Sequence, residues 1–127
     1  MDDLPKDVLR FIAEQIESVP HLEALLLLYR NSAERWTVEL VATRLFVSPQ
    51  KAKEILADLE GRKLIRLRAD GSADAYVYDG AWDETGERME TIATTYTRQL
   101  ARVATFIHAK PPRAVREFAR AFEFKKE

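Results

Sequence analysis

Apolar side chains recur three and four positions apart through most of this chain, which is the spacing of one face of an α-helix. In the first such stretch the apolar face is formed by Val8, Phe11, Ile12 and Ile16. Between residues 21 and 29 nearly every position is apolar, which indicates a helix buried on all sides. The pattern predicts helices over residues 7–18, 21–29, 37–45, 50–62, 84–109 and 114–124.

A serine and a proline mark the start of the fourth predicted helix. The hydroxyl of Ser48 can accept a hydrogen bond from a backbone N–H of the first turn, and Pro49 suits the first helical position because its φ is fixed. The buried face of the helix that follows is expected to be Ala52, Ile55, Leu56 and Leu59. Residues 37–62 are therefore predicted to form two short helices joined by a tight turn.

A period of two replaces the helical period after this pair of helices. Residues 64–68 and 75–78 alternate between apolar and polar side chains around Asp70-Gly71-Ser72, which is typical of a β-hairpin. Helix, turn, helix and hairpin form a winged helix-turn-helix unit, whose second helix commonly enters the DNA major groove. The predicted fold is mainly α, with a small β-hairpin wing and flanking N- and C-terminal helices.

Residues 37–78 resemble the winged helix-turn-helix transcriptional regulators of bacteria. The phrase Leu56-Ala-Asp-Leu-Glu-Gly-Arg-Lys-Leu-Ile65 is similar to the junction between recognition helix and wing in that superfamily. Lys63 occupies the place where the superfamily usually has glycine, and a left-handed residue is expected at this helix end. Two helices before the winged unit and two after it resemble the element order of the multiple-antibiotic-resistance (MarR) and phenolic-acid (PadR) regulator types.

The predicted helix over residues 84–109 carries apolar residues spaced 4, 3, 4, 3 and 4 apart. This a/d pattern favours a dimer seam, which the resemblance also implies. The alternative is that the same face packs on the core of its own domain. The candidate dimerisation residues are Met89, Ala93, Tyr96, Leu100, Val103 and Ile107.

The surface of the helix-turn-helix is the strongest candidate for a functional site. Side chains in the first turns of a recognition helix contact base edges, and cations on the wing and the preceding helix contact phosphates. Glu54 and Asp58 lie four residues apart on one helix, and both would repel phosphate. The candidate DNA-binding residues are Thr37, Arg44, Ser48, Gln50, Lys51, Lys53, Glu54, Arg66 and Arg68.

The distribution of charge leaves a second function open. The net charge is −1, and residues 36–80 carry seven basic and seven acidic side chains. Residues 110–127 carry six basic and three acidic side chains, so the segment that contains the predicted last helix is basic. Proteins that bind DNA usually show a basic footprint at the helix-turn-helix. We therefore expect a homodimeric regulator that binds double-stranded DNA, and the alternative is a winged-helix adaptor that binds another protein without direct DNA contact.

Length and composition set further limits. The 127 residues suit a single domain, with N-terminal helices in residues 1–35, the winged unit in 36–80 and C-terminal helices in 84–127. No apolar run approaches the about 20 residues that span a bilayer, and there is no cysteine. We expect a cytoplasmic protein without a membrane contact.

Enzymatic residues are not apparent in the sequence. His21 and His108 are the only histidines, they lie on separate predicted helices, and they lack the spacing of a metal site. No serine has the context of a nucleophile elbow, and no glycines form a phosphate-binding loop. We expect no catalysis, no metal and no cofactor. Most of the aromatic residues around the wing and the predicted long helix are expected to fill the core, and the resemblance implies that a ligand pocket can form at their junction: Trp36, Tyr76, Tyr78, Trp82, Tyr96 and Phe106.

Overall fold

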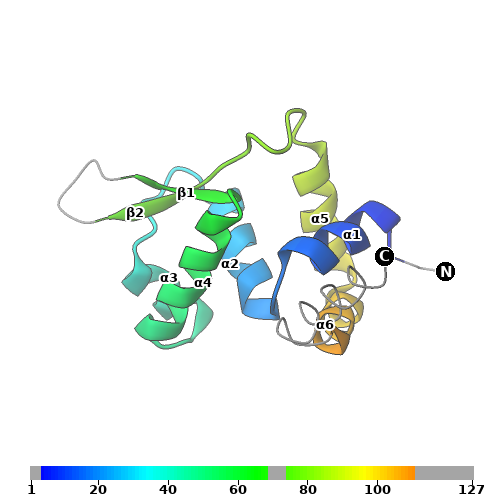
Figure 1. Cartoon of the computed structure of the whole chain (residues 1–127), viewed down its shortest axis with the longest axis horizontal. Helices are drawn as coiled ribbons and strands as arrows, with labels where there is room; N and C mark the ends of the chain where they lie inside the picture. Colours follow the sequence, from blue (N-terminus) through cyan, green and yellow to red (C-terminus); the bar gives the residue numbers. More distant parts are fainter. Residues whose placement is uncertain (1–3, 69–73, 111–127) are drawn as a thin grey trace, which may run out of the picture.

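The computed structural model describes residues 4–68 and 74–110, which form six α-helices and one antiparallel hairpin (Figure 1). The mainly α winged-helix fold is confirmed. The predicted turn at residues 70–72 and the predicted helix at 114–124 lie outside the described residues. The elements are α1 (Lys6–Gln15), α2 (Val19–Arg30), α3 (Val38–Leu45), α4 (Pro49–Gly61), β1 (Ile65–Arg68), β2 (Ala75–Tyr78), α5 (Glu87–Arg98) and α6 (Leu100–Ala109).

Helix α2 lies at the centre of the molecule, as its nearly continuous apolar sequence predicts. It packs against α3, α4 and β2 on one side and against α6 on the other, and α1 packs against α5. In Figure 1 the winged unit of α3, α4, β1 and β2 lies on the left, whereas α1, α5 and α6 lie on the right. The largest side chains without solvent exposure include Trp36, Ile12, Leu25 and Leu56.

Hydroxyl side chains begin three of the helices. The Oγ atoms of Ser18 and Ser48 accept from the backbone N–H of His21 and Lys51, at 3.4 and 3.1 Å. Thr37 caps α3 in the same way. Helix α1 ends at Gln15, three residues before the predicted end, because the chain must become extended for Ser18 to cap α2.

The junction between α4 and the wing has the predicted left-handed residue. Lys63 has a φ of +65°, and the backbone N–H of Leu64 donates to the carbonyl of Leu59 at 3.1 Å. This is the hydrogen bond of a Schellman motif. Lysine therefore adopts the conformation that glycine usually provides at this place.

The hairpin has the predicted strands. Arg66 pairs with Val77 and Arg68 pairs with Ala75, so that both arginines share one face of β1. An isolated bridge joins Trp36 to Tyr76 on the other edge of β2, with the backbone N–H of Tyr76 donating to the Trp36 carbonyl at 2.8 Å. The start of the helix-turn-helix is thus attached to the wing.

The prediction of one helix over residues 84–109 is wrong. The segment begins as a helix at Glu87, breaks at Gln99, and continues as α6 in another direction (Figure 1). Gln99 has φ −129° and ψ 47°, which is outside the helical region. Three threonines in the turn before the break lower the helix propensity, and the packing of α6 on α2 decides the direction.

Candidate nucleic-acid interface

The turn between α3 and α4 presents the first residues of the recognition helix to solvent. Phe46 ends α3 in the left-handed conformation, and Ser48 and Pro49 then start α4 at the predicted positions. Ser48, Gln50 and Lys51 are all exposed. The free N–H groups of a helix N-terminus attract anions, so this end of α4 favours phosphate.

One outward face of α4 carries most of the predicted base contacts. Gln50, Lys53 and Glu54 are exposed, as predicted. The side-chain amide of Gln50 donates to Oε2 of Glu54 at 3.2 Å. This hydrogen bond directs the amide N–H toward the protein's own carboxylate and orients the Gln50 side chain before any partner binds.

Helix α3 contributes one exposed cation. The guanidinium of Arg44 lies 5.0 Å from the ring centroid of Trp36, a cation–π distance that holds the side chain at the surface of the turn. Thr37 is half-buried, and its hydroxyl accepts from the backbone N–H of Leu40 at 3.2 Å. The hydroxyl of Thr37 is therefore already engaged as a helix cap.

Two arginines extend the cationic surface onto the wing. Arg66 and Arg68 are both exposed on the same face of β1. The hairpin and the α3–α4 pair lie on the same side of the molecule in Figure 1. The structure thus brings the predicted cations to one half of the fold, divided between the turn and the wing.

Asp58 does not belong to this surface, which corrects the interpretation that it faces phosphate. Its side chain is 19% exposed, and Oδ2 lies 3.3 Å from Nε2 of His21 and accepts from Nε of Arg62 at 3.1 Å. Arg62 also donates to the carbonyl of Glu14 at 2.8 Å. Asp58 and Arg62 therefore connect the end of α4 to α1 and α2.

His21 is buried and contacts two polar side chains, which its position at a helix start does not indicate. It lies at the predicted helix start, but it is only 8% exposed, and its Nδ1 lies 2.6 Å from the Oγ of Ser18. A neutral ring protonated at Nε2 can donate to Asp58 and accept from Ser18. Because 37 positions separate His21 from Asp58, no local pattern in the sequence indicates this contact.

Local charge at the α3–α4 turn is positive, although the winged unit is neutral in sum. Residues 40–53 contain Arg44, Lys51 and Lys53 and no acidic residue. Of the acidic residues elsewhere in the unit, Asp58 is paired with Arg62, and Asp79 accepts from the backbone N–H of Ala81 at 3.0 Å. The segment of the turn therefore carries three cations between Glu39 and Glu54, a local excess that a sum over residues 36–80 does not reveal.

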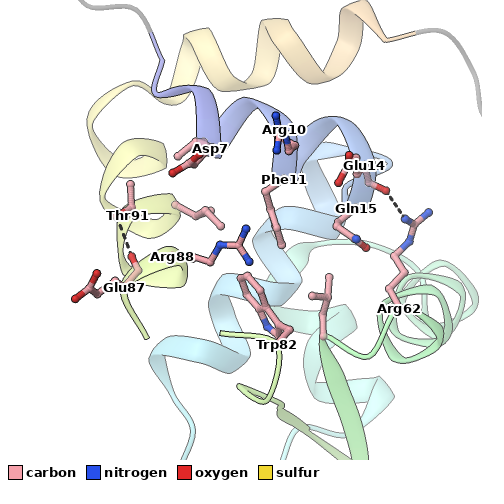
Figure 2. Close-up of a pocket in the computed structure, with 13 residues that line it drawn as sticks. Asp7, Arg10, Phe11, Glu14, Gln15, Arg62, Trp82, Glu87, Arg88 and Thr91 are labelled. Carbon is pink, nitrogen blue, oxygen red and sulfur yellow. Dashed lines mark hydrogen bonds between the residues drawn. The ribbon is translucent and has the colours of Figure 1, made fainter. Parts of the chain in front are cut away.

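A pocket of about 350 Å³ lies between α1 and α5 (Figure 2). Of the aromatic residues predicted to surround a pocket, Trp82 is among its lining residues, and the pocket is otherwise formed mainly by α1 and α5. The rings of Phe11 and Trp82 stack with centroids 5.0 Å apart, and the guanidinium of Arg88 lies 5.9 Å from the Trp82 ring. Figure 2 shows Arg88 pointing toward the side of this ring pair, and Arg62 at the opposite edge, where it donates to the backbone carbonyl of Glu14. The pocket therefore offers an aromatic surface with charged groups of both signs around it.

Two tyrosines, the buried Tyr96 and the half-buried Tyr78, have strongly raised pKa values. Burial raises the pKa of Tyr78 to about 12, with a further contribution from the carboxylate of Asp83. Burial also raises the pKa of Tyr96 to about 12, and its hydroxyl donates to Oε2 of Glu23 at 3.0 Å. Both phenols stay protonated at neutral pH and serve the packing between α2, the wing and α5.

The residues predicted to form a dimer seam divide unequally. Leu100 is 53% exposed. The other five are buried in the core of the single chain, as the alternative interpretation of this helix expected: Met89, Ala93, Tyr96, Val103 and Ile107. Leu100 is therefore the one member of the set that a second subunit can reach without rearrangement.

Within residues 4–68 and 74–110, no cluster of three or more His, Asp or Glu side chains is arranged to hold a metal ion. Among the same residues, no helix has the length and apolar character needed to cross a bilayer.

No protein-family model matches the sequence, and no curated protein matches it significantly. Among solved structures, a substitution mutant of MepR from S. aureus is similar with a TM-score of 0.53 and 14% identity, over 95% of this chain and 85% of that chain. MepR bound to ethidium bromide has a TM-score of 0.52 and 15% identity, over 93% of this chain and 85% of that chain. An ArsR-like transcriptional regulator from Rhodococcus sp. RHA1 has a TM-score of 0.50 and 24% identity, over 81% of this chain and 93% of that chain. The chain therefore has the winged-helix fold found in transcriptional regulators.

Proposed function

We propose that this protein is a transcriptional regulator that binds double-stranded DNA with the α3–α4 turn, the exposed face of α4 and the wing. The observation that carries the proposal is the set of exposed cations Arg44, Lys51 and Lys53 around the N-terminus of α4, in a segment (residues 40–53) that contains no acidic residue. The fold shared with transcriptional regulators supports it. A regulator acts where the chromosome is, which is the cytoplasm of a bacterial cell.

The exposed residues divide into two groups by their chemistry. Gln50 can read a base edge, since its amide offers a donor and an acceptor in the major groove. Arg44, Lys51, Lys53, Arg66 and Arg68 are suited to phosphates, which fix the position of the protein and carry no sequence information. The other three candidate residues have structural contacts. Thr37 and Ser48 cap α3 and α4, and Glu54 accepts a hydrogen bond from Gln50.

We place the dimer contact at the start of α6. Leu100 is exposed there, and Ala101 and Ala104 lie one and four residues further along the same helix. A two-fold dimer would present two recognition helices to half-sites about one helical turn apart. Light scattering should show a dimer, and Leu100→Asp should give a folded monomer because Leu100 is not part of the core. A wild-type monomer at high micromolar concentration would refute the dimer.

DNA binding is tested by fluorescence anisotropy on duplexes of about 30 bp selected from a random pool, at about 50 and 200 mM salt. With two or three phosphate contacts per subunit, log K should fall against log salt with a slope of about −4 to −5. Arg68→Ala should weaken all sequences equally and flatten the slope. Gln50→Ala should instead change which sequence is preferred.

The adaptor function is the outcome if the wild-type protein binds no duplex at low salt. Glu54 and Glu60 are exposed on α4, and they would then meet a basic protein partner. Duplex binding that weakens with added salt would instead support the DNA-binding function. This salt dependence should become smaller when Lys51 and Lys53 are both changed to alanine.

Ligand binding in the pocket is a second candidate function. The stacked rings of Phe11 and Trp82 favour a planar aromatic molecule, and one of the similar structures holds ethidium. Arg62 lines the pocket and pairs with Asp58 on α4, so that a ligand that displaces Arg62 would alter the recognition helix. Ethidium bromide, used as a probe, should quench tryptophan fluorescence of the wild type, and Phe11→Ala should weaken that binding.

A further inference from the structure

Phe46 is the most exposed large apolar side chain among the described residues. Its side chain is 95% exposed, compared with 53% for Leu100 and 39% for Leu67. A phenyl ring in water gains nothing from the hydrophobic effect, since none of its surface is removed from solvent. The ring therefore does not stabilise the fold of the single chain.

The backbone at Phe46 is unfavourable for phenylalanine as well. Its φ of 59° and ψ of 43° lie in the left-handed region, which among the described residues other than glycine is shared only with Lys63. Glycine is the usual residue at such a helix end because it has no Cβ. Conformation and solvation both favour glycine at position 46, so neither accounts for the aromatic side chain there.

Hydrogen bonds hold the turn in place. The backbone N–H of Phe46 donates to the carbonyl of Thr43 at 3.4 Å, and the N–H of Val47 donates to the carbonyl of Ala42 at 3.1 Å. The backbone that carries the ring is thus held two residues before the N-cap Ser48. An apolar group that is already fixed loses little backbone entropy when it binds a partner.

The surroundings of Phe46 indicate a polyanion as the partner. Arg44 lies two residues before it, Lys51 lies five residues after it, and no acidic residue occurs between positions 40 and 53. The N-terminus of α4 adds the positive end of a helix dipole. Aromatic and cationic groups on one turn fit a duplex, where the ring can pack against a thymine methyl group or a deoxyribose.

We propose that Phe46 is an apolar DNA contact that contributes to both affinity and sequence preference. The assignment rests on the proposed function. It differs from the phosphate contacts because the phenyl ring carries no charge and releases no counterions.

The test compares Phe46→Gly with Lys63→Gly, the matched control that relieves the other left-handed residue without removing an aromatic ring. Both variants should keep or raise the thermal midpoint, by up to about 4 °C. Phe46→Gly should weaken binding of the selected duplex about fivefold to twentyfold with an unchanged salt slope, because no phosphate contact is lost. Lys63→Gly should bind as the wild type does.

Each other outcome decides the question. Equal affinity of Phe46→Gly and wild type for the duplex would overturn the assignment and leave the proposed function intact. A flatter salt slope in Phe46→Gly would show that the variant disturbs phosphate contacts, which also overturns it. If the wild type binds no duplex even at low salt, the proposed function is wrong and this assignment fails with it. Phe46→Leu should bind with intermediate affinity, since it retains part of the apolar surface.

Discussion

The two ends of the recognition helix differ in how they are held. At the N-terminus of α4, Ser48, Gln50 and Lys51 are exposed, and the Ser48 cap is a contact within the same turn. At the C-terminus, Asp58 and Arg62 contact groups on α1 and α2. One end is free to meet a partner, and the other is fastened to the helical core.

This difference changes the meaning of charge in the winged unit. The winged unit carries seven basic and seven acidic residues, and this neutral sum argues against the basic footprint that DNA-binding proteins usually show. Asp58 and Arg62 pair at the fastened end, and Asp58 lies about 14 Å along the helix axis from Pro49 at a rise of about 1.5 Å per residue. The free end keeps Arg44, Lys51 and Lys53 without an acidic residue between positions 40 and 53.

The largest expected effect on stability comes from removing the Asp58 contacts that attach the C-terminus of α4 to the helical core. Asp58→Ala removes the carboxylate that His21 and Arg62 share, and leaves two partly buried donors without that partner. We expect a loss of about 1–3 kcal/mol in the free energy of unfolding, measured by urea denaturation.

Glu54→Ala is the matched control, since Glu54 lies one helical turn earlier on α4 and is exposed. The free energy of unfolding of the Glu54→Ala variant should stay within about 0.5 kcal/mol of the wild-type value. If Asp58→Ala leaves the stability unchanged and strengthens DNA binding, Asp58 faces the duplex after all and the distinction between the two ends is wrong.

Two serine caps provide a finer comparison of the same ends. Ser48→Ala removes a cap at the free end and should cost about 1 kcal/mol. Ser18→Ala removes the cap of α2 and also the hydroxyl that lies 2.6 Å from Nδ1 of His21, so it should cost about 1–2 kcal/mol. Thermal unfolding of both variants shows which of them loses more stability. A smaller loss of stability in Ser18→Ala than in Ser48→Ala would mean that the contact with His21 adds no stability.

The features that the sequence predicted correctly are those set by neighbouring residues. Ser48 and Pro49 fix the start of α4, and the alternation after Leu64 fixes the strands, because caps and strand periodicity act within a few positions. Lys63 followed the same rule, since a helix that ends in this motif requires a left-handed residue whatever its side chain is.

The features that the sequence could not predict depend on contacts between distant segments. The break at Gln99 has no proline or glycine to signal it, and it allows α6 to pack against α2, a contact between distant segments. The contact of His21 with Asp58 likewise joins two helices that are far apart in the chain. Sequence periodicity describes the face that is buried, but it does not say which element covers that face.

The smallest expected effect is at the residue that joins the fastened end of α4 to the wing. Lys63 is exposed and left-handed, so Lys63→Gly should stabilise the protein by about 0.5 kcal/mol, the relief of the left-handed strain less the added entropy of glycine in the unfolded chain. Gly61→Ala should add a similar gain, because a Cβ at this helical position meets no atom within 4 Å. The two changes together move the glycine two positions along the chain, from the helix to the turn that requires it. Urea denaturation of the single and double variants measures both gains. A loss of stability in Lys63→Gly would mean that the lysine side chain itself stabilises this junction.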